Sequence, residues 1–163
     1  SDQVGDAGDA GVGAACATCE GVDACEERVE VGPALHVEGD LDYSDSPPAG
    51  GSHNGCWATW GAHAEEVRPE NWVHNLEHGG VVFLYACPEG CADEVTLLAD
   101  FANGHERVLF TPYKGLPSRF AFVAWGVRLL ADCADVEVAR AFYDAHVGHG
   151  LESVAADPPA SCR

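Results

Sequence analysis

The sequence predicts a single α+β domain with a mixed, mainly antiparallel sheet of about four strands and two helices. Three observations support this class. Short apolar runs of strand length occur in the C-terminal half, two amphipathic segments lie among them, and the N-terminal half is rich in glycine and proline. A length of 163 residues suits one hydrophobic core. A long, loop-rich half is therefore expected to precede the regular structure.

The apolar runs contain β-branched and aromatic residues, as is typical of buried strands. Gly126 separates the last two runs and is placed to form a turn between them. The predicted strands are Val81–Ala86, Arg107–Thr111, Phe120–Trp125 and Val127–Leu130.

Two segments carry apolar residues at three-to-four spacing, which predicts helices over Ala92–Asn103 and Asp135–His146. Asn103 and Gly104 close the first helix, and Asp135 is placed to cap the second. The resulting order is strand, helix, three strands and helix.

Composition divides the chain into three parts. Residues 1–31 read as a flexible acidic arm that contains Cys16, Cys19 and Cys25. Residues 32–157 form the predicted domain, and residues 158–163 a C-terminal tail. The two-residue spacing of Cys16 and Cys19 occurs in zinc sites. No second such pair follows, so disulfides that fasten the arm are the favoured interpretation.

Charge and cysteine content restrict the function classes. The net charge of −19 repels phosphate backbones and argues against nucleic-acid binding. Eight cysteines in a chain of this size are typical of an oxidising compartment, so a periplasmic or extracellular location is expected. No apolar run is long enough to span a membrane. The arm is compatible with an N-terminal membrane tether or lipid anchor.

The most informative stretch is Trp72-Val73-His74-Asn75-Leu76-Glu77-His78-Gly79-Gly80. His74 and His78 are four residues apart, so they share one face of a helical turn. Neutral imidazole is a common ligand of zinc and copper. The spacing therefore indicates a metal site, against the alternative of histidines that make only structural hydrogen bonds.

The same stretch fits the H-x-x-E-H pattern of a class of zinc proteases, in which the glutamate is the general base and a distant glutamate the third ligand. Glu152 lies at a suitable sequence distance. That mechanism requires a long helix, whereas Gly79-Gly80 and a strand follow the motif at once. A zinc-dependent hydrolase is therefore a weaker alternative.

Several motifs together resemble the bacterial domain-of-unknown-function 3105 (DUF3105) family. The resemblance covers about residues 34–153 and rests on His36-Val37, Pro47-Pro48-Ala49-Gly50-Gly51-Ser52-His53, the stretch around His74, Ala124-Trp125-Gly126 and Gly150-Leu151-Glu152. Leu151 stands where the family usually has proline, and Ala49-Gly50-Gly51 replaces Thr-Ser-Gly. The resemblance implies an exported or membrane-tethered protein of unestablished activity.

The candidate metal ligands are His36, His53, His74 and His78, with Glu77 and Cys56 as further candidates. Four imidazoles, or three together with Glu77 or a cysteine, suit a tetrahedral zinc or a copper ion. We therefore expect a metal ion as partner and cofactor. The expected role is metal binding rather than catalysis, and the protein partner is left open.

A second candidate is Cys87-Pro88-Glu89-Gly90-Cys91, between the first predicted strand and helix. Thiols at a helix N-terminus are reactive, and thioredoxin-like proteins carry theirs in this position. A thioredoxin-like variant is thus an alternative fold, and thiol–disulfide exchange or copper delivery an alternative function. A structural disulfide, internal or to Cys56 or Cys133, is favoured over both. A structural envelope module without any site is the remaining alternative.

Overall fold

The computed structural model describes residues 26–162, which form one mixed six-stranded sheet with the strand order β1-β6-β5-β3-β4-β2. β3 is parallel to β4, and β4 to β2, whereas the pairs β3–β5, β5–β6 and β6–β1 are antiparallel. The strands are β1 (Glu26–Arg28), β2 (Gly61–Ala62), β3 (Val81–Tyr85), β4 (Val108–Pro112), β5 (Phe120–Ala124) and β6 (Val127–Ala131).

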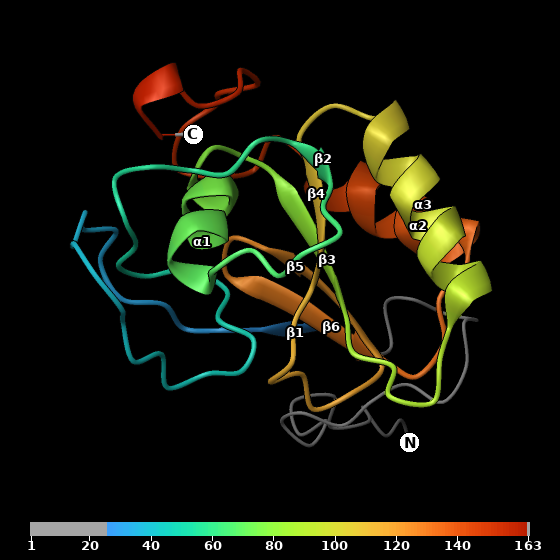
Figure 1. Ribbon diagram of the computed structural model, residues 1–163. Coiled ribbons are helices and arrows are strands. Elements are labelled where there is room, and N and C mark those ends of the chain that lie inside the picture. Colours follow the sequence, from blue (N-terminus) through green and yellow to red (C-terminus); the bar gives the residue numbers. More distant parts are fainter. Residues whose placement is uncertain (1–25, 163) are drawn as a thin grey trace, which may run out of the picture.

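Three α-helices cover the two faces of this sheet (Figure 1). α1 (Pro69–Glu77) lies on one face, whereas α2 (Ala92–Gly104) and α3 (Val136–His146) lie together on the other. A short 3-10 helix, Ala160–Cys162, ends the described chain on the side of α1. None of the helices within residues 26–162 is long and apolar enough to cross a membrane.

Each face of the sheet has its own apolar core, because alternate residues of a strand point to opposite sides. Phe83, Phe110 and Phe122 point toward α2 and α3, where they meet Phe101 and Phe142. Val82, Leu84, Leu109 and Val123 point toward α1, where they meet Trp72, Val73 and Leu76. The sheet is therefore buried on both faces and forms a rigid support for α1.

The α+β class and the elements of the C-terminal half are confirmed. All four predicted strands and both predicted helices are present, with bounds that differ by at most one residue. The Asp135 side chain caps α3 by accepting a hydrogen bond from the backbone N–H of Val138 (2.9 Å). The strand count was too low, because β1 and β2 have only three and two residues and show no alternating pattern.

The first helix was also missing from the prediction. α1 has nine residues, too few for a clear apolar period, and its polar side chains are buried. Pro69 opens it at a position where no backbone donor is needed. Its C-terminus is a Schellman motif, in which the N–H groups of Gly79 and Gly80 donate to the carbonyls of Leu76 and Asn75 (both 3.0 Å). Gly79 has φ +86°, which favours glycine.

Two further predictions concern the N-terminal arm, residues 1–31, and the thioredoxin-like alternative fold. Residues 1–25, with Cys16, Cys19 and Cys25, lie outside the described residues. Residues 26–28 of the arm form the edge strand β1. The alternative of a thioredoxin-like variant expects a further helix between β4 and β5, and residues 113–119 there form none.

Candidate metal centre

Two loop segments place His36 next to His53. The segments pair as a single parallel β-bridge between these residues. The N–H of Val37 donates to the carbonyl of His53 (2.8 Å), and the N–H of His53 donates to that of Leu35 (2.9 Å). The Asn54 amide nitrogen ties the same segments together by donating to the carbonyls of Val37 and Gly39. The main chain thus sets the spacing of the two imidazoles.

α1 contributes the other three side chains. His74, Glu77 and His78 follow at i, i+3 and i+4, so they lie on one face of the last helical turn. All three are at most 5% exposed. The backbone N–H of Asn54 donates to the carbonyl of Glu70 (2.8 Å), which fastens the histidine loops to the helix.

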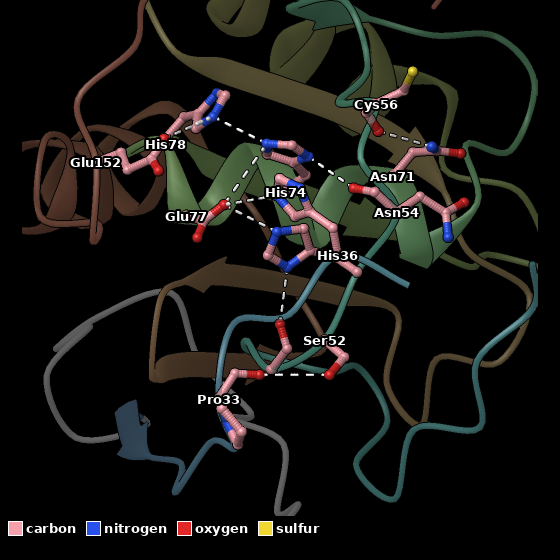
Figure 2. A network of polar contacts seen from close by, with 12 residues as sticks. Pro33, His36, Ser52, Asn54, Cys56, Asn71, His74, Glu77, His78 and Glu152 are labelled. Carbon is pink, nitrogen blue, oxygen red and sulfur yellow. Dashed lines mark hydrogen bonds and ion pairs between the residues drawn. The ribbon is translucent and has the colours of Figure 1, made fainter. Parts of the chain in front are cut away.

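The Glu77 carboxylate is the centre of the cluster (Figure 2). Its Oε2 atom lies 2.9 Å from Nε2 of His53, 3.7 Å from Nε2 of His74 and 3.8 Å from Nε2 of His36. One ligand atom from each of these four residues lies within 4.8 Å of all the others. His53, His74 and Glu77 are buried, whereas the His36 side chain is 57% exposed. The group is thus open to solvent on the side of His36.

The tautomers of the two buried imidazoles follow from their partners. Nδ1 of His53 lies 2.9 Å from the carbonyl oxygen of Gly51, and Nδ1 of His74 lies 2.8 Å from that of Asn54. A carbonyl oxygen only accepts, so each Nδ1 carries the proton and donates it. In the neutral rings both Nε2 atoms are therefore bare acceptors that face the Glu77 carboxylate.

His78 lies beside this group and contacts a further carboxylate. Its Nε2 is 3.0 Å from Nε2 of His74 and 3.3 Å from Oε1 of Glu152. Glu77, His78 and Glu152 form a second set whose ligand atoms lie within 4.8 Å of one another. Glu152 was considered as a ligand only in the alternative of a zinc-dependent hydrolase and was not in the predicted histidine cluster. Its only sequence signals were its place in the Gly150-Leu151-Glu152 segment and its distance from the H-x-x-E-H pattern.

Burial determines the charge state of the α1 histidines. Burial lowers the pKa of His74 to about 4, although the hydrogen bond to the Asn54 carbonyl raises it. Burial also lowers the pKa of His78, while Glu152 and Glu77 oppose that shift. The Trp57 ring covers both imidazoles at centroid distances of 5.2 Å and 4.6 Å. Both rings are thus neutral at pH 7, the form that binds metals.

The comparison with protein families agrees with these positions. The family model described as "Protein of unknown function (DUF3105)" matches residues 36–161. The chain belongs to the DUF3105 family. The match begins at His36 and includes every side chain of both ligand sets. No curated protein and no solved structure matches the chain.

In this DUF3105 protein the candidate ligand Cys56 is unavailable, which corrects the sequence prediction. Its sulfur forms a disulfide with Cys162, 106 residues away. The sequence near His53 placed Cys56 close to the candidate ligands but did not reveal its disulfide partner, because Cys162 lies far away in the C-terminal tail. The bond fastens the C-terminal segment across the site. The indole N–H groups of Trp57 and Trp60 donate to the carbonyl of Ala156 (3.0 Å and 3.1 Å).

Cys87 and Cys91 form a disulfide with each other at the start of α2. Cys87 is half-buried and Cys91 is buried. Of the pairings that the sequence left open for these two cysteines, the internal one is present. The two disulfides accord with an oxidising compartment.

Proposed function

We propose that this DUF3105 protein binds one transition-metal ion, Zn²⁺ or Cu²⁺, through His36, His53, His74 and Glu77. The observation that supports this most strongly is the direction of the imidazoles. Two buried rings are fixed through Nδ1 on backbone carbonyls, so their Nε2 lone pairs face one buried carboxylate. Lone pairs that face an anion repel it unless a cation or a proton lies between them. A metal ion supplies that cation.

The arrangement matches what metal ligands need around them. Metal-binding histidines usually donate their other ring N–H to a carbonyl or carboxylate, which fixes the ring and its tautomer. Gly51 and Asn54 provide such carbonyls here. Four ligands are the usual number for a structural zinc ion. The buried His53 and His74 are already held in place before an ion arrives.

The ligand types limit the choice of ion. Imidazole suits zinc and copper, whereas Cu⁺ prefers thiolate and thioether sulfur. Cys56 is in a disulfide, and the chain contains no methionine. We therefore favour Zn²⁺ and Cu²⁺ over Cu⁺. The net charge of −19 also attracts cations to the surface around the site.

The role we propose is binding or handling of the metal outside the cytoplasm, rather than catalysis. The disulfides support the location, and the set of four ligands supports a closed coordination shell. A zinc-dependent hydrolase would need the glutamate of H-x-x-E-H free as a general base. Glu77 instead lies within 3.8 Å of three imidazoles, where it serves as a ligand.

The test is metal analysis of untagged protein after dialysis against Zn²⁺ or Cu²⁺, for wild type, His53→Ala and His105→Ala. His105 is the matched control, because its Nδ1 also donates to a backbone carbonyl (Phe101, 2.8 Å) while its ring stacks on Phe101 and forms no ion pair with a carboxylate within residues 26–162. We expect one tightly held ion in wild type and His105→Ala and a loss of it in His53→Ala. Equal metal content in all three proteins would contradict the proposal.

A second candidate function, thiol–disulfide exchange at Cys87 and Cys91, has one specific observation in its favour. Cys87 lines a cavity of about 430 Å³ together with Tyr85, Pro112, Tyr113 and Leu116. A partner with an exposed thiol could reach the half-buried sulfur there. Mass mapping after mild treatment with a dithiol tests this function. Selective reduction of this pair would support it, and resistance equal to that of Cys56–Cys162 would contradict it.

A further inference from the structure

One buried imidazole of the cluster is left over once the first four ligands are assigned. His78 is 3% exposed, and its Nε2 lies 3.3 Å from Oε1 of Glu152. Its Nδ1 is buried without a hydrogen-bond partner among the described residues. Glu77, His78 and Glu152 together offer ligand atoms within 4.8 Å of one another. The ligand atoms of the first set lie within the same limit of 4.8 Å.

His78 does not fit as a further ligand of the first ion. The set of His36, His53, His74 and Glu77 already supplies the four ligands of a tetrahedral ion. His78 lies outside that set, and its Nε2, which is 3.0 Å from Nε2 of His74, is also 3.3 Å from Oε1 of Glu152. Glu77 is the residue common to both sets. A carboxylate has two oxygens, so one carboxylate can serve two ions at once.

We propose that Glu77, His78 and Glu152 form a second divalent-cation position, with Glu77 bridging it to the first; this rests on the proposed function. Carboxylates commonly link pairs of ions about 3.5–4 Å apart. Two carboxylates and four neutral imidazoles would offset half of the charge of two divalent ions. The acidic surface contributes to the remainder.

The main chain fixes Glu152 at this position. The N–H of Glu152 donates to the carbonyl of Glu77 (2.8 Å), and the N–H of Val154 donates to that of His78 (3.1 Å). The N–H of Gly148 donates to the carbonyl of Gly79 (2.7 Å) on the preceding side. The C-terminal segment thus satisfies carbonyls at the end of α1 and brings one carboxylate to His78. An acidic residue that only solvates the surface needs no such anchoring.

The second position differs from the first in its exposure. Glu152 has a side chain that is 56% exposed, and the set has three protein ligands instead of four. Zinc sites with three protein ligands complete their shell with water or an exogenous ligand. The second ion is therefore expected to bind more weakly, to exchange faster and to carry water.

The test is calorimetric titration of the metal-free protein with Zn²⁺, comparing wild type, Glu152→Gln and Glu89→Gln. Glu89 is exposed in the loop of the Cys87–Cys91 disulfide and controls for the loss of one negative charge. We expect two equivalents in wild type and Glu89→Gln, with the second bound at least about tenfold more weakly. Glu152→Gln should bind one equivalent, with the first affinity changed less than about threefold.

The outcomes separate this inference from the proposed function. One equivalent in both wild type and Glu152→Gln, or two in both, would overturn the second position while leaving the first intact. No binding by wild type would overturn both. Electron paramagnetic resonance with two equivalents of Cu²⁺ gives an independent result. Two Cu²⁺ ions bridged by Glu77 produce a spectrum with spin–spin coupling in wild type. A second ion bound elsewhere on the acidic surface produces a spectrum without that coupling, which would contradict the bridged position.

Discussion

Nε2 of His53 lies 2.9 Å from Oε2 of Glu77, while Nδ1 of the same ring donates to the carbonyl of Gly51. The two contacts cannot both be favourable for a neutral ring and an ionised carboxylate, because Nε2 then has no proton to offer. The contact becomes favourable when a cation lies between the two atoms. A metal ion would supply that cation, so Glu77 is the residue whose substitution should be most informative.

Glu77→Gln should weaken Zn²⁺ or Cu²⁺ binding at least about tenfold, because it removes the only anionic ligand of the first set. The metal-free protein should keep its stability or gain some, since the Gln amide N–H can donate to Nε2 of His53. Calorimetric titration gives the affinity. Thermal unfolding in chelator gives the stability.

Glu70→Gln is the matched control for that substitution. Glu70 is also buried on α1, but it pairs with Arg68 (3.2 Å) instead of imidazoles. Its substitution should lower stability and leave metal affinity unchanged. If Glu70→Gln weakened binding as much as Glu77→Gln does, the effect would come from disturbance of α1 and the role of Glu77 as a ligand would be wrong.

The metal-free protein should lose stability as the pH falls from about 6.5 toward 4. His74 has a folded pKa of about 4 because of burial, below its ordinary value of 6.5. Between these two values the unfolded chain binds more protons than the folded one, so stability rises with pH there. The lowered pKa of His78 acts in the same direction.

Urea unfolding in chelator at pH 7.0, 5.5 and 4.5 measures this dependence. The comparison of wild type with His74→Gln isolates the contribution of His74, because other carboxylates and histidines remain in both proteins. The slope of stability against pH should be shallower in the variant. An identical slope would show that His74 titrates alike in the folded and unfolded chains.

The fold and the site differ in how far they could be predicted from the sequence. β3 to β6, α2 and α3 were predicted, because continuous apolar runs of strand length and three-to-four spacing determine elements that pack on a core. β1 and β2 form through pairing with β6 and β4, which no local pattern of three or two residues can show. α1 was missed because Glu70, His74 and Glu77 are buried through polar contacts.

The histidines were found because two of them share one helical turn and the others lie in family motifs. Their meeting point was a hypothesis until the β-bridge between His36 and His53 placed them beside α1. Glu152 reaches the site because its backbone N–H bonds the carbonyl of Glu77, 75 residues earlier. The Cys56–Cys162 disulfide joins residues that are 106 positions apart. Both contacts require the C-terminal segment to return to α1. Contacts at such separations leave no periodic signal in one sequence.

Removal of the Cys56–Cys162 disulfide should cost more stability than removal of Cys87–Cys91. The Cys56–Cys162 bond closes a loop with a sequence separation of 106 residues, whereas the Cys87–Cys91 bond closes a loop with a separation of only 4. The entropy of loop closure gives about 4–5 kcal/mol for the first and about 2 kcal/mol for the second. Urea unfolding of the paired Cys→Ser variants measures both values. Equal losses would show that packing around the bonds, rather than loop entropy, determines their contribution.

Gly150→Ala should separate the C-terminal segment from the end of α1. A Cβ at residue 150 would lie 2.4 Å from both the carbonyl oxygen of Glu77 and the backbone nitrogen of Gly79. The N–H of Gly79 is held in the Schellman motif, and the Glu77 carbonyl belongs to the last turn of α1, so neither atom can easily move away. The segment must therefore shift, and Glu152 with it. We expect loss of the second equivalent of Zn²⁺, retention of the first, and a lower melting temperature.

Gly104→Ala is the control for that substitution, because no atom lies within 4 Å of a Cβ at residue 104, at the end of α2. Alanine there should leave metal stoichiometry unchanged and stability equal or up to about 1 kcal/mol higher. Thermal unfolding in chelator and Zn²⁺ titration compare the two variants directly. If Gly150→Ala kept both equivalents at wild-type affinity, the close backbone contact at Gly150 would not be what positions Glu152, and the second ion would have to depend on other ligands.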